Sequence, residues 1–325
     1  MEKNKKLNYH YVVFSYPRDY FKVMFQNAID EFDVEYISDP IVHGGYGKIL
    51  QIAYHLHFNP YLNWKYELPF KDKWLKLYYN KTSLKPICFL FLMDWIVPRN
   101  RGLIDILKVK YPNAKFVVYL EDLVSRHSFD VEEAKKFDLV ISYDKGDAKR
   151  YNYVYYPTFM SKINLKRVEK EHSDFCFIGL PKNRLDKIYE VYHYLSSLGY
   201  KCDFIISGLK EKKQRISGIK YINHDMNYYD YLQHVVNSDC IVEIMQENAQ
   251  GFTLRTWEAL LYNKKLLTNN ADIVNTDFYN PSQIMVFDDI KKISTDSFHK
   301  AIFDSLDFMD KISPINLFKL LESKL

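Results

Sequence analysis

The sequence predicts an α/β protein that is built from two tandem, doubly wound domains. Short apolar runs, which are typical of strands, alternate with helix-like segments along the chain. This alternation is typical of parallel sheets that have helices on both faces. Several runs, such as residues 87–93, are apolar at every position, as expected of strands that are buried on both faces. A charged stretch at residues 162–173 interrupts the pattern, which starts again at Asp174.

The first series of elements comes before the charged stretch. Its candidate strands are short runs rich in β-branched and aromatic residues, at 9–16, 34–38, 87–93, 115–120, 139–143 and 153–156. Its candidate helices carry apolar residues at helical spacing, at 20–31, 47–58, 102–110 and 131–136. We therefore expect an N-terminal domain at residues 1–160.

The second series follows the charged stretch, which we interpret as a linker at residues 161–173 because it has few apolar residues. The candidate strands are 175–179, 201–207, 220–222, 239–244, 265–268 and 283–287. The candidate helices are 184–197, 227–236, 253–261, 296–307 and 314–323. These elements indicate a C-terminal domain at residues 174–308 and a final helical segment at 309–325.

Length and composition indicate a folded, cytoplasmic protein. The chain has 325 residues, of which 47% are hydrophobic and 26% charged, so each domain can bury its own core. A net charge of +4 is too small to indicate a nucleic-acid partner, but it is compatible with peripheral contact with an anionic membrane. No apolar run approaches the 18 or so residues that a membrane span needs, and the polar N-terminus does not resemble a signal peptide.

The segment 246–260 contains the most informative motif of the chain. It follows a predicted strand and passes through Gly251 into a predicted helix. The first turn of a helix has free backbone N–H groups and a partial positive charge, so it favours phosphate. We expect the N–H groups of Gly251, Thr253 and Leu254, together with the Thr253 hydroxyl, to bind a diphosphate. Arg255 adds a cation and Glu258 an acceptor for ribose hydroxyls.

These residues, with the following Lys265-Leu266-Leu267-Thr268-Asn269-Asn270, resemble the donor-binding segment of GT-B glycosyltransferases. The resemblance is strongest to bacterial enzymes that build capsule, lipopolysaccharide or other surface glycans. In many retaining members, two glutamates lie eight residues apart here; the second binds the ribose and the first lies near the sugar. Glu258 matches the second glutamate, whereas the position of the first is occupied by the amide Gln250.

The resemblance implies a GT-B architecture of two Rossmann-like domains, with the final helix folded back onto the first domain. It implies a nucleotide-sugar donor on the second domain, with UDP preferred to GDP, and a glycan or lipid-linked acceptor on the first. Chemistry would take place in the cleft between them, at the inner face of the cytoplasmic membrane. No cofactor or metal is expected, because the first domain has no DxD motif and helix dipoles with basic side chains can neutralise the diphosphate.

Further donor contacts are expected at two other strand ends of the second domain. Gly179 ends a predicted strand and is followed by Lys182 and Arg184, which can supply a point charge and a forked contact to phosphate. Asn223 follows another strand, in a loop that borders the nucleobase in the related fold.

The candidate catalytic residues lie at strand ends of the first domain. An inverting transferase needs a general base for the acceptor hydroxyl. Asp122, which follows the predicted strand 115–120, is the first candidate, and Asp94 and His43 follow it.

Other functions remain open at this point. The same scaffold could carry a nucleotide-sugar epimerase or a transferase that modifies nucleic acid. A binding protein without catalysis could also retain the fold, as the amide at Gln250 suggests.

Overall fold

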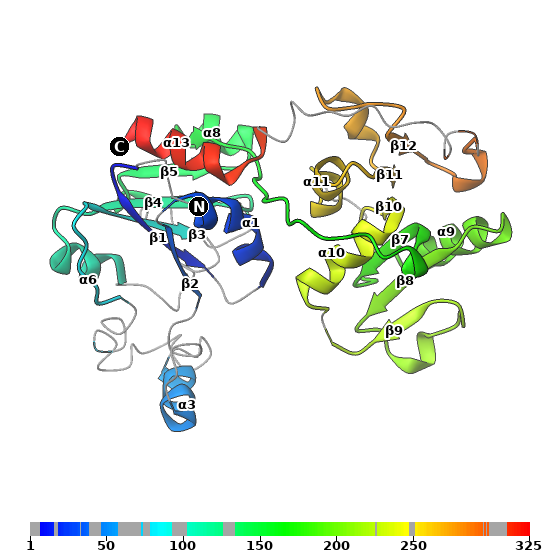
Figure 1. The fold of residues 1–325 in the computed structure, drawn as a ribbon, viewed down its shortest axis with the longest axis horizontal. Helices are drawn as coiled ribbons and strands as arrows, with labels where there is room; N and C mark the ends of the chain where they lie inside the picture. The colour runs from blue at the N-terminus through cyan, green and yellow to red at the C-terminus, as the bar shows by residue number, and fades with distance from the viewer. Residues whose placement is uncertain are drawn as a thin grey trace. The chain divides into compact units, whose positions relative to one another are not determined.

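The computed structural model describes residues 7–15, 19–32, 34–38, 47–57, 73, 79–92, 103–125, 134–224, 226–246, 251–294, 296, 298 and 311–325. The chain forms two compact units. Met1–Ser161 and Ile312–Leu325 make the first, and Lys162–Lys311 make the second. Each unit contains a six-stranded sheet in which all the described strand pairs are parallel (Figure 1).

The sheet of the first unit has the strand order β2-β1-β3-β4-β5-β6. The strands are β1 (His10–Ser15), β2 (Val34–Ser38), β3 (Ile87–Leu92), β4 (Lys115–Leu120), β5 (Leu139–Ser142) and β6 (Val154–Tyr155). Alternate residues of β1 enter different cores: Val12 and Phe14 belong to one apolar cluster, whereas Tyr11 and Val13 belong to another. The sheet is therefore covered on both faces, as the continuous apolar strands predict.

The first unit has five described helices, some of which contribute to these two cores. They are α1 (Asp19–Glu31), α3 (Lys48–His57), α6 (Leu103–Lys110), α8 (Lys145–Tyr151) and α13 (Pro314–Lys324). The α6 residues Ile104 and Leu107 pack in one cluster, and residues of α1 and α13 pack together in the other. The helix α13 thus lies in the core of the first unit although it ends the chain (Figure 1).

Aromatic packing and one carboxylate hold α13 in this position. Phe318 is fully buried, and its ring centroid lies 4.9 Å from that of Tyr11 and 6.2 Å from that of Phe25. Glu322 accepts hydrogen bonds from the Tyr11 hydroxyl (2.9 Å) and the Asn8 backbone N–H (2.9 Å). The last helix therefore ties the start of β1 to the core.

The sheet of the second unit has the order β12-β11-β10-β7-β8-β9. Its strands are β7 (Ser173–Gly179), β8 (Cys202–Ser207), β9 (Lys220–Ile222), β10 (Ser238–Glu243), β11 (Lys265–Thr268) and β12 (Ile284–Val286). The connecting helices are α9 (Leu185–Ser197), α10 (Tyr228–Asn237) and α11 (Leu254–Leu261), with short 3-10 turns at Glu169–Glu171, Glu211–Lys213, Ala271–Asn275 and Ile290–Lys292. The predicted fold class, two successive doubly wound α/β domains, is confirmed.

The segment that we interpret as a linker is bonded to the second unit. The backbone N–H of Ile163 donates to the Tyr262 hydroxyl (3.0 Å), and that of Val168 donates to Asn237 Oδ1 (2.8 Å). Most of the expected helix 296–307, and half of that at 131–136, lies outside the described residues. Within the part of the chain that the structure describes, no helix has both the length and the apolar character needed to cross a bilayer.

Shortening Phe318 tests the role of α13. We expect Phe318→Ala to lower the free energy of unfolding by about 3–5 kcal/mol, because it leaves a cavity in a closely packed aromatic core. Urea unfolding of the full chain, followed by circular dichroism, measures the change. Lys319→Ala, at an exposed position of the same helix, is the matched control, and equal unfolding midpoints for the two variants would contradict the packing argument.

Candidate anion-binding site

Two strand ends and one helix start meet in the second unit. The strands β7 and β10 are parallel neighbours, and they end at Gly179 and Glu243 respectively. The loop that follows β10 leads to Thr253, which is the N-cap of α11. Neighbouring parallel strands have their carboxyl ends at one edge of the sheet, where ligands bind in open α/β folds. The end of β7, the end of β10 and the start of α11 are therefore expected at one edge of the sheet, and the predicted diphosphate-binding residues lie in these three segments.

Main-chain carbonyl groups of this edge hold Arg184 and Arg255. The Arg255 guanidinium donates to the carbonyl of Ile178 on β7. The Arg184 guanidinium donates to the carbonyl of Ile244, directly after β10, and to that of Leu180 (3.3 Å). The Cζ atoms of both guanidinium groups also lie near the centroid of the buried Phe177 ring, at 5.8 Å for Arg184 and 5.2 Å for Arg255. Two cations from different helices are thus anchored beside one strand end.

No carboxylate of the described residues is in direct contact with this arginine pair. Neither guanidinium forms an ion pair with a carboxylate among the residues that the structure describes, and the Nε atoms of both are buried without a hydrogen-bond partner there. Burial and the neighbouring Arg255 charge lower the pKa of Arg184 to about 10, so the protonated form is disfavoured although it still predominates at neutral pH. An anion at this position would relieve the repulsion.

Gly179 makes the position of Arg255 possible. A Cβ atom at this glycine would lie 2.5 Å from an Arg255 terminal nitrogen, which is far below a normal contact. Gly179 is therefore needed at the end of β7 because a side chain would clash with the guanidinium. Its backbone does not have a positive φ. Gly251, by contrast, has a positive φ of 79°, a conformation that glycine adopts at little cost, and it brings the chain to α11.

Glu243 is a residue of this site that our sequence reasoning does not identify. It is fully buried at the end of β10, and its carboxylate accepts hydrogen bonds from the hydroxyls of Thr253 (2.5 Å), Thr256 (2.9 Å) and Thr268 (2.6 Å). The signal in the sequence is a carboxylate directly after the apolar run Cys240-Ile241-Val242, with threonines further along the chain. In this arrangement the one hydroxyl proton of Thr253 is donated to Glu243, so the expected donation from this hydroxyl to phosphate stays a prediction that requires the bond to be exchanged.

Glu258, the expected ribose acceptor, faces into the domain. Its side chain is only 1% exposed, and its two carboxylate oxygens accept hydrogen bonds from Tyr228 (2.6 Å) and from Tyr231, both on α10. Burial raises the pKa of Glu258, and the tyrosine hydroxyls oppose part of that rise by stabilising the carboxylate. In this arrangement the Glu258 carboxylate is buried and each of its oxygens has a tyrosine donor, so it is not exposed to a ribose.

The remaining expected residues are placed as follows. Lys182 is exposed after β7, with a positive φ of 46°, and Asn223 is exposed after β9. Leu254 is the first residue of α11 and is half-buried. Asp122 is half-buried just beyond β4 in the first unit, where its carboxylate accepts a hydrogen bond from the Leu123 N–H (2.7 Å). Three other candidates lie outside the described residues: Asp94, His43 and Gln250.

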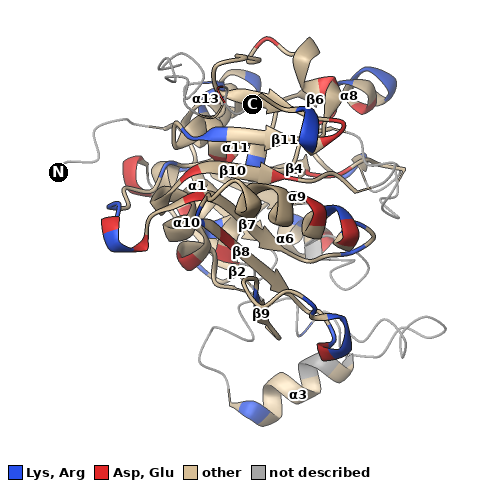
Figure 2. Cartoon of the chain, turned by 90° about the vertical axis from the view of Figure 1, so that its right-hand side faces the viewer, with Lys and Arg blue, Asp and Glu red and all other residues tan. Residues whose placement is uncertain are grey.

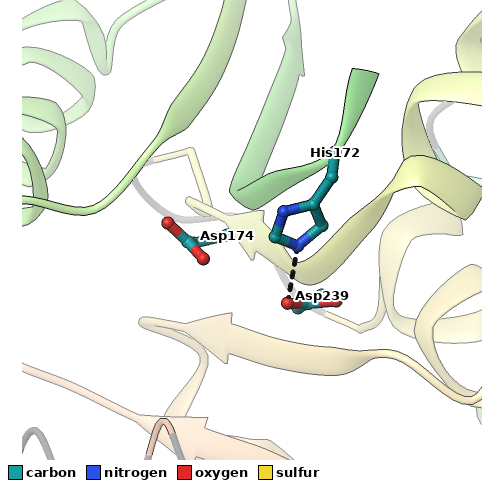
Figure 3. Close-up of side chains that lie close together, drawn as sticks. All are labelled: His172, Asp174 and Asp239. Carbon is teal, nitrogen blue, oxygen red and sulfur yellow. Dashed lines mark hydrogen bonds and ion pairs between the residues drawn. The ribbon is translucent and has the colours of Figure 1, made fainter. Parts of the chain in front are cut away.

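A second polar cluster lies at the opposite edge of the same sheet. His172 and Asp174 flank the start of β7, and Asp239 lies at the start of β10 (Figure 3). The carboxylate of Asp239 accepts hydrogen bonds from His172 (2.8 Å) and Arg167 (2.9 Å). Although burial acts in the opposite direction, these two partners lower the pKa of Asp239. A cation already fills one side of this carboxylate, so the cluster is better explained as an ion-pair network than as a metal centre.

A cavity of about 430 Å³ lies along the outer face of α10. Its lining includes His224, Asn227, Asp230 and His234. Tyr228 and Tyr231, which bind Glu258, do not line it, and neither does either arginine of the site. The candidate site is placed at the arginine pair, because the cavity walls carry charges of both signs whereas the pair has no ion-pair partner among the described residues.

The architecture is similar to that of known glycosyltransferases. An α-glucosyltransferase, solved in complex with UDP-glucose and DNA containing an abasic site, superposes with a TM-score of 0.57 at 11% identity, over 95% of this chain and 99% of its own. The trehalose-6-phosphate synthase OtsA superposes with a TM-score of 0.55 at 10% identity, over 97% and 98%. No protein-family model and no curated protein matches the sequence. At such low identity these similarities establish the fold, and the chain has the two-domain GT-B architecture.

Proposed function

We propose that the protein is a glycosyltransferase that takes a sugar from a nucleotide-diphosphate donor bound by the second domain. The observation that carries the proposal is the arginine pair. Arg184 and Arg255 are held by main-chain carbonyls beside the start of α11, without a carboxylate partner among the described residues. A diphosphate supplies the missing negative charge, and the free N–H groups of a helix start complete its coordination.

The donor is proposed to be a UDP-sugar. The structurally similar α-glucosyltransferase was solved with UDP-glucose, and this supports uracil in preference to guanine. Arg184, Arg255 and the backbone of Gly251–Leu254 would stabilise the diphosphate as it leaves, and such preorganised charge is a large part of enzymatic rate enhancement. Lys182 would add an exposed charge, and Asn223 would contact the base. No metal is required in this proposal, since the cations are supplied by side chains.

Transfer breaks the bond between the sugar C1 and the diphosphate oxygen and forms a bond from C1 to an acceptor oxygen. The acceptor hydroxyl proton must go to a base. We propose Asp122 for this role, because it is a half-buried carboxylate at the carboxyl end of β4, the edge where parallel sheets bind ligands. The acceptor is proposed to be a glycan or a lipid-linked sugar of surface polysaccharide synthesis.

Contact with a membrane surface is supported by the helix α3. Its apolar residues Ile49, Ile52 and Leu56 share one helix face and are 86%, 60% and 54% exposed. Figure 2 shows the described part of this helix mainly in the colour of residues other than Lys, Arg, Asp and Glu. Its first residue is Lys48. An exposed apolar stripe beside lysine is suited to the interface of an anionic bilayer.

Nucleotide binding and donor turnover test the proposal together. We expect the wild-type protein to bind UDP by calorimetry and to release UDP from a UDP-sugar when glycan or lipid-linked acceptors are present. Arg184→Ala and Arg255→Ala should each weaken UDP binding by about 10- to 100-fold, the cost of a lost charged hydrogen bond.

Arg215→Ala, at an exposed position of the same domain, is the control and should bind UDP normally. A wild-type protein that bound none of UDP, GDP, CDP and dTDP would refute the donor assignment. Formation of an epimerised sugar nucleotide without any acceptor would show an epimerase instead of a transferase. Transfer of sugar only to DNA would replace the proposed acceptor class.

The ribose contact of Glu258 is tested with 2′,3′-dideoxy-UDP, which lacks both hydroxyls. If the carboxylate binds the ribose, the wild type prefers UDP to the dideoxy analogue, and Glu258→Gln loses most of that preference. Tyr231→Phe, which frees one carboxylate oxygen, should keep the preference. If Glu258→Gln and the wild type discriminate equally well, Glu258 serves only to join α10 and α11.

The membrane contact is tested by vesicle co-sedimentation of the full chain. We expect binding to vesicles with anionic lipid, and at least about fivefold weaker binding after Ile49→Ser with Ile52→Ser, because less apolar area is then buried in the interface. Val274→Ser, at an exposed apolar position of the second domain, is the control. Equal sedimentation of all three proteins would exclude α3 as the contact.

A further inference from the structure

Glu243 forms the centre of a buried hydrogen-bond network, and it directly precedes Ile244, whose carbonyl holds Arg184. The residue is the last of β10 and has no exposed surface. One carboxylate oxygen accepts from Thr253 and Thr256 at the start of α11, and the other accepts from Thr268 at the end of β11. Three neutral donors thus satisfy a charge that burial alone would make very costly.

The network continues to the loop that precedes α11. The hydroxyl oxygen of Thr268 accepts from the backbone N–H of Asn270 (3.0 Å), and the Asn270 side-chain amide donates to the Gly251 carbonyl (2.9 Å). Asn270 is itself 7% exposed. Gly251 and Thr253 are therefore fixed from two directions, by Asn270 on one side and by Glu243 on the other. The backbone between them cannot move without breaking one of these bonds.

The same carboxylate also influences the arginine pair without bonding to it. The charge of Glu243 raises the pKa of Arg184, against the larger lowering by burial and by Arg255. A direct ion pair would occupy the guanidinium groups and compete with an anionic ligand. Because the carboxylate oxygens are taken by threonine hydroxyls, the negative charge moderates the repulsion while the guanidinium groups stay available.

From these contacts we infer that Glu243 is a positioning residue of the donor site: through Thr253, Thr256 and Thr268 it holds the start of α11 where its N–H groups meet the diphosphate. The inference rests on the proposed function and assigns to that site a residue that touches no ligand. Its effect is specific to the phosphate groups, since the network contacts the helix start and not the loop expected to border the base. Loss of Glu243 should therefore lower the affinity for UDP and leave the affinity for uridine unchanged.

The experiment compares the dissociation constants of UDP and uridine for the full chain by calorimetry, with uridine measured by competition. We expect Glu243→Gln to weaken UDP binding by about tenfold, because the amide cannot accept all three hydroxyls and the helix start loses its fixed position. Uridine affinity should stay within about twofold of wild type. Glu171→Gln, an exposed position, is the control for the change of charge.

A second variant keeps the test informative if Glu243→Gln does not fold. Thr268→Val removes one donor and keeps the shape, and it should also weaken UDP binding selectively. Thr276→Val is its control, because the Thr276 hydroxyl donates to the Ile273 carbonyl (2.7 Å) outside the network.

Two results would overturn the inference. In the first, a folded variant of the network loses affinity for UDP and for uridine in the same proportion, or loses affinity for neither. Glu243 then has only a structural role, and the proposed function is unaffected. If the wild-type protein binds no nucleotide diphosphate, the proposed function fails and the inference fails with it.

Discussion

The organisation of the second domain depends on how two guanidinium groups are held at one sheet edge without contact to a carboxylate of the residues that the structure describes. Like charges that are partly buried repel each other, and burial adds a desolvation cost. Main-chain carbonyls at the ends of β7 and β10 provide fixed dipoles that offset part of this cost for Arg184 and Arg255. The remaining imbalance of charge is local to this edge, and the proposal of an anion-binding site depends on it.

Two carboxylates of this region are buried and accept hydrogen bonds from neutral hydroxyl groups. Glu243 is bound by three threonines and Glu258 by two tyrosines, although both belong to the segment around the arginine pair. Ion pairing with the arginines would be the simpler electrostatic solution. The hydroxyl partners bind the two acids instead, so the acids join α10, α11 and β11 while the described part of the chain leaves both guanidinium groups without a carboxylate partner.

The first domain has a different construction, in which the extreme C-terminus completes the core. The aromatic contacts of Phe318 and the hydrogen bonds of Glu322 join α13 to β1 and α1. The exposed stripe of α3 does not take part in these two described cores. The same domain thus contains a tightly satisfied aromatic core and a helix whose apolar face is open to a partner.

Much of the fold could be predicted from the sequence, because apolar periodicity reports burial directly. The all-apolar run that became β3 is buried along its whole length, and the helix start at Thr253 follows from its N-cap chemistry. The site was predictable to the extent that it depends on strand ends. Arg184 and Arg255 both lie there, since carboxyl ends of neighbouring parallel strands meet whatever the intervening sequence.

The sequence by itself therefore determined the order of strands and helices, the two domains and the edge of the sheet where the cations gather. Only the tertiary structure decided which polar groups satisfy one another. The partners of Glu243 are 10, 13 and 25 residues away along the chain, and those of Glu258 are 30 and 27. Such pairs have no local sequence signature, because they arise when separate helices and strands pack on one sheet and each buried charge must find a donor.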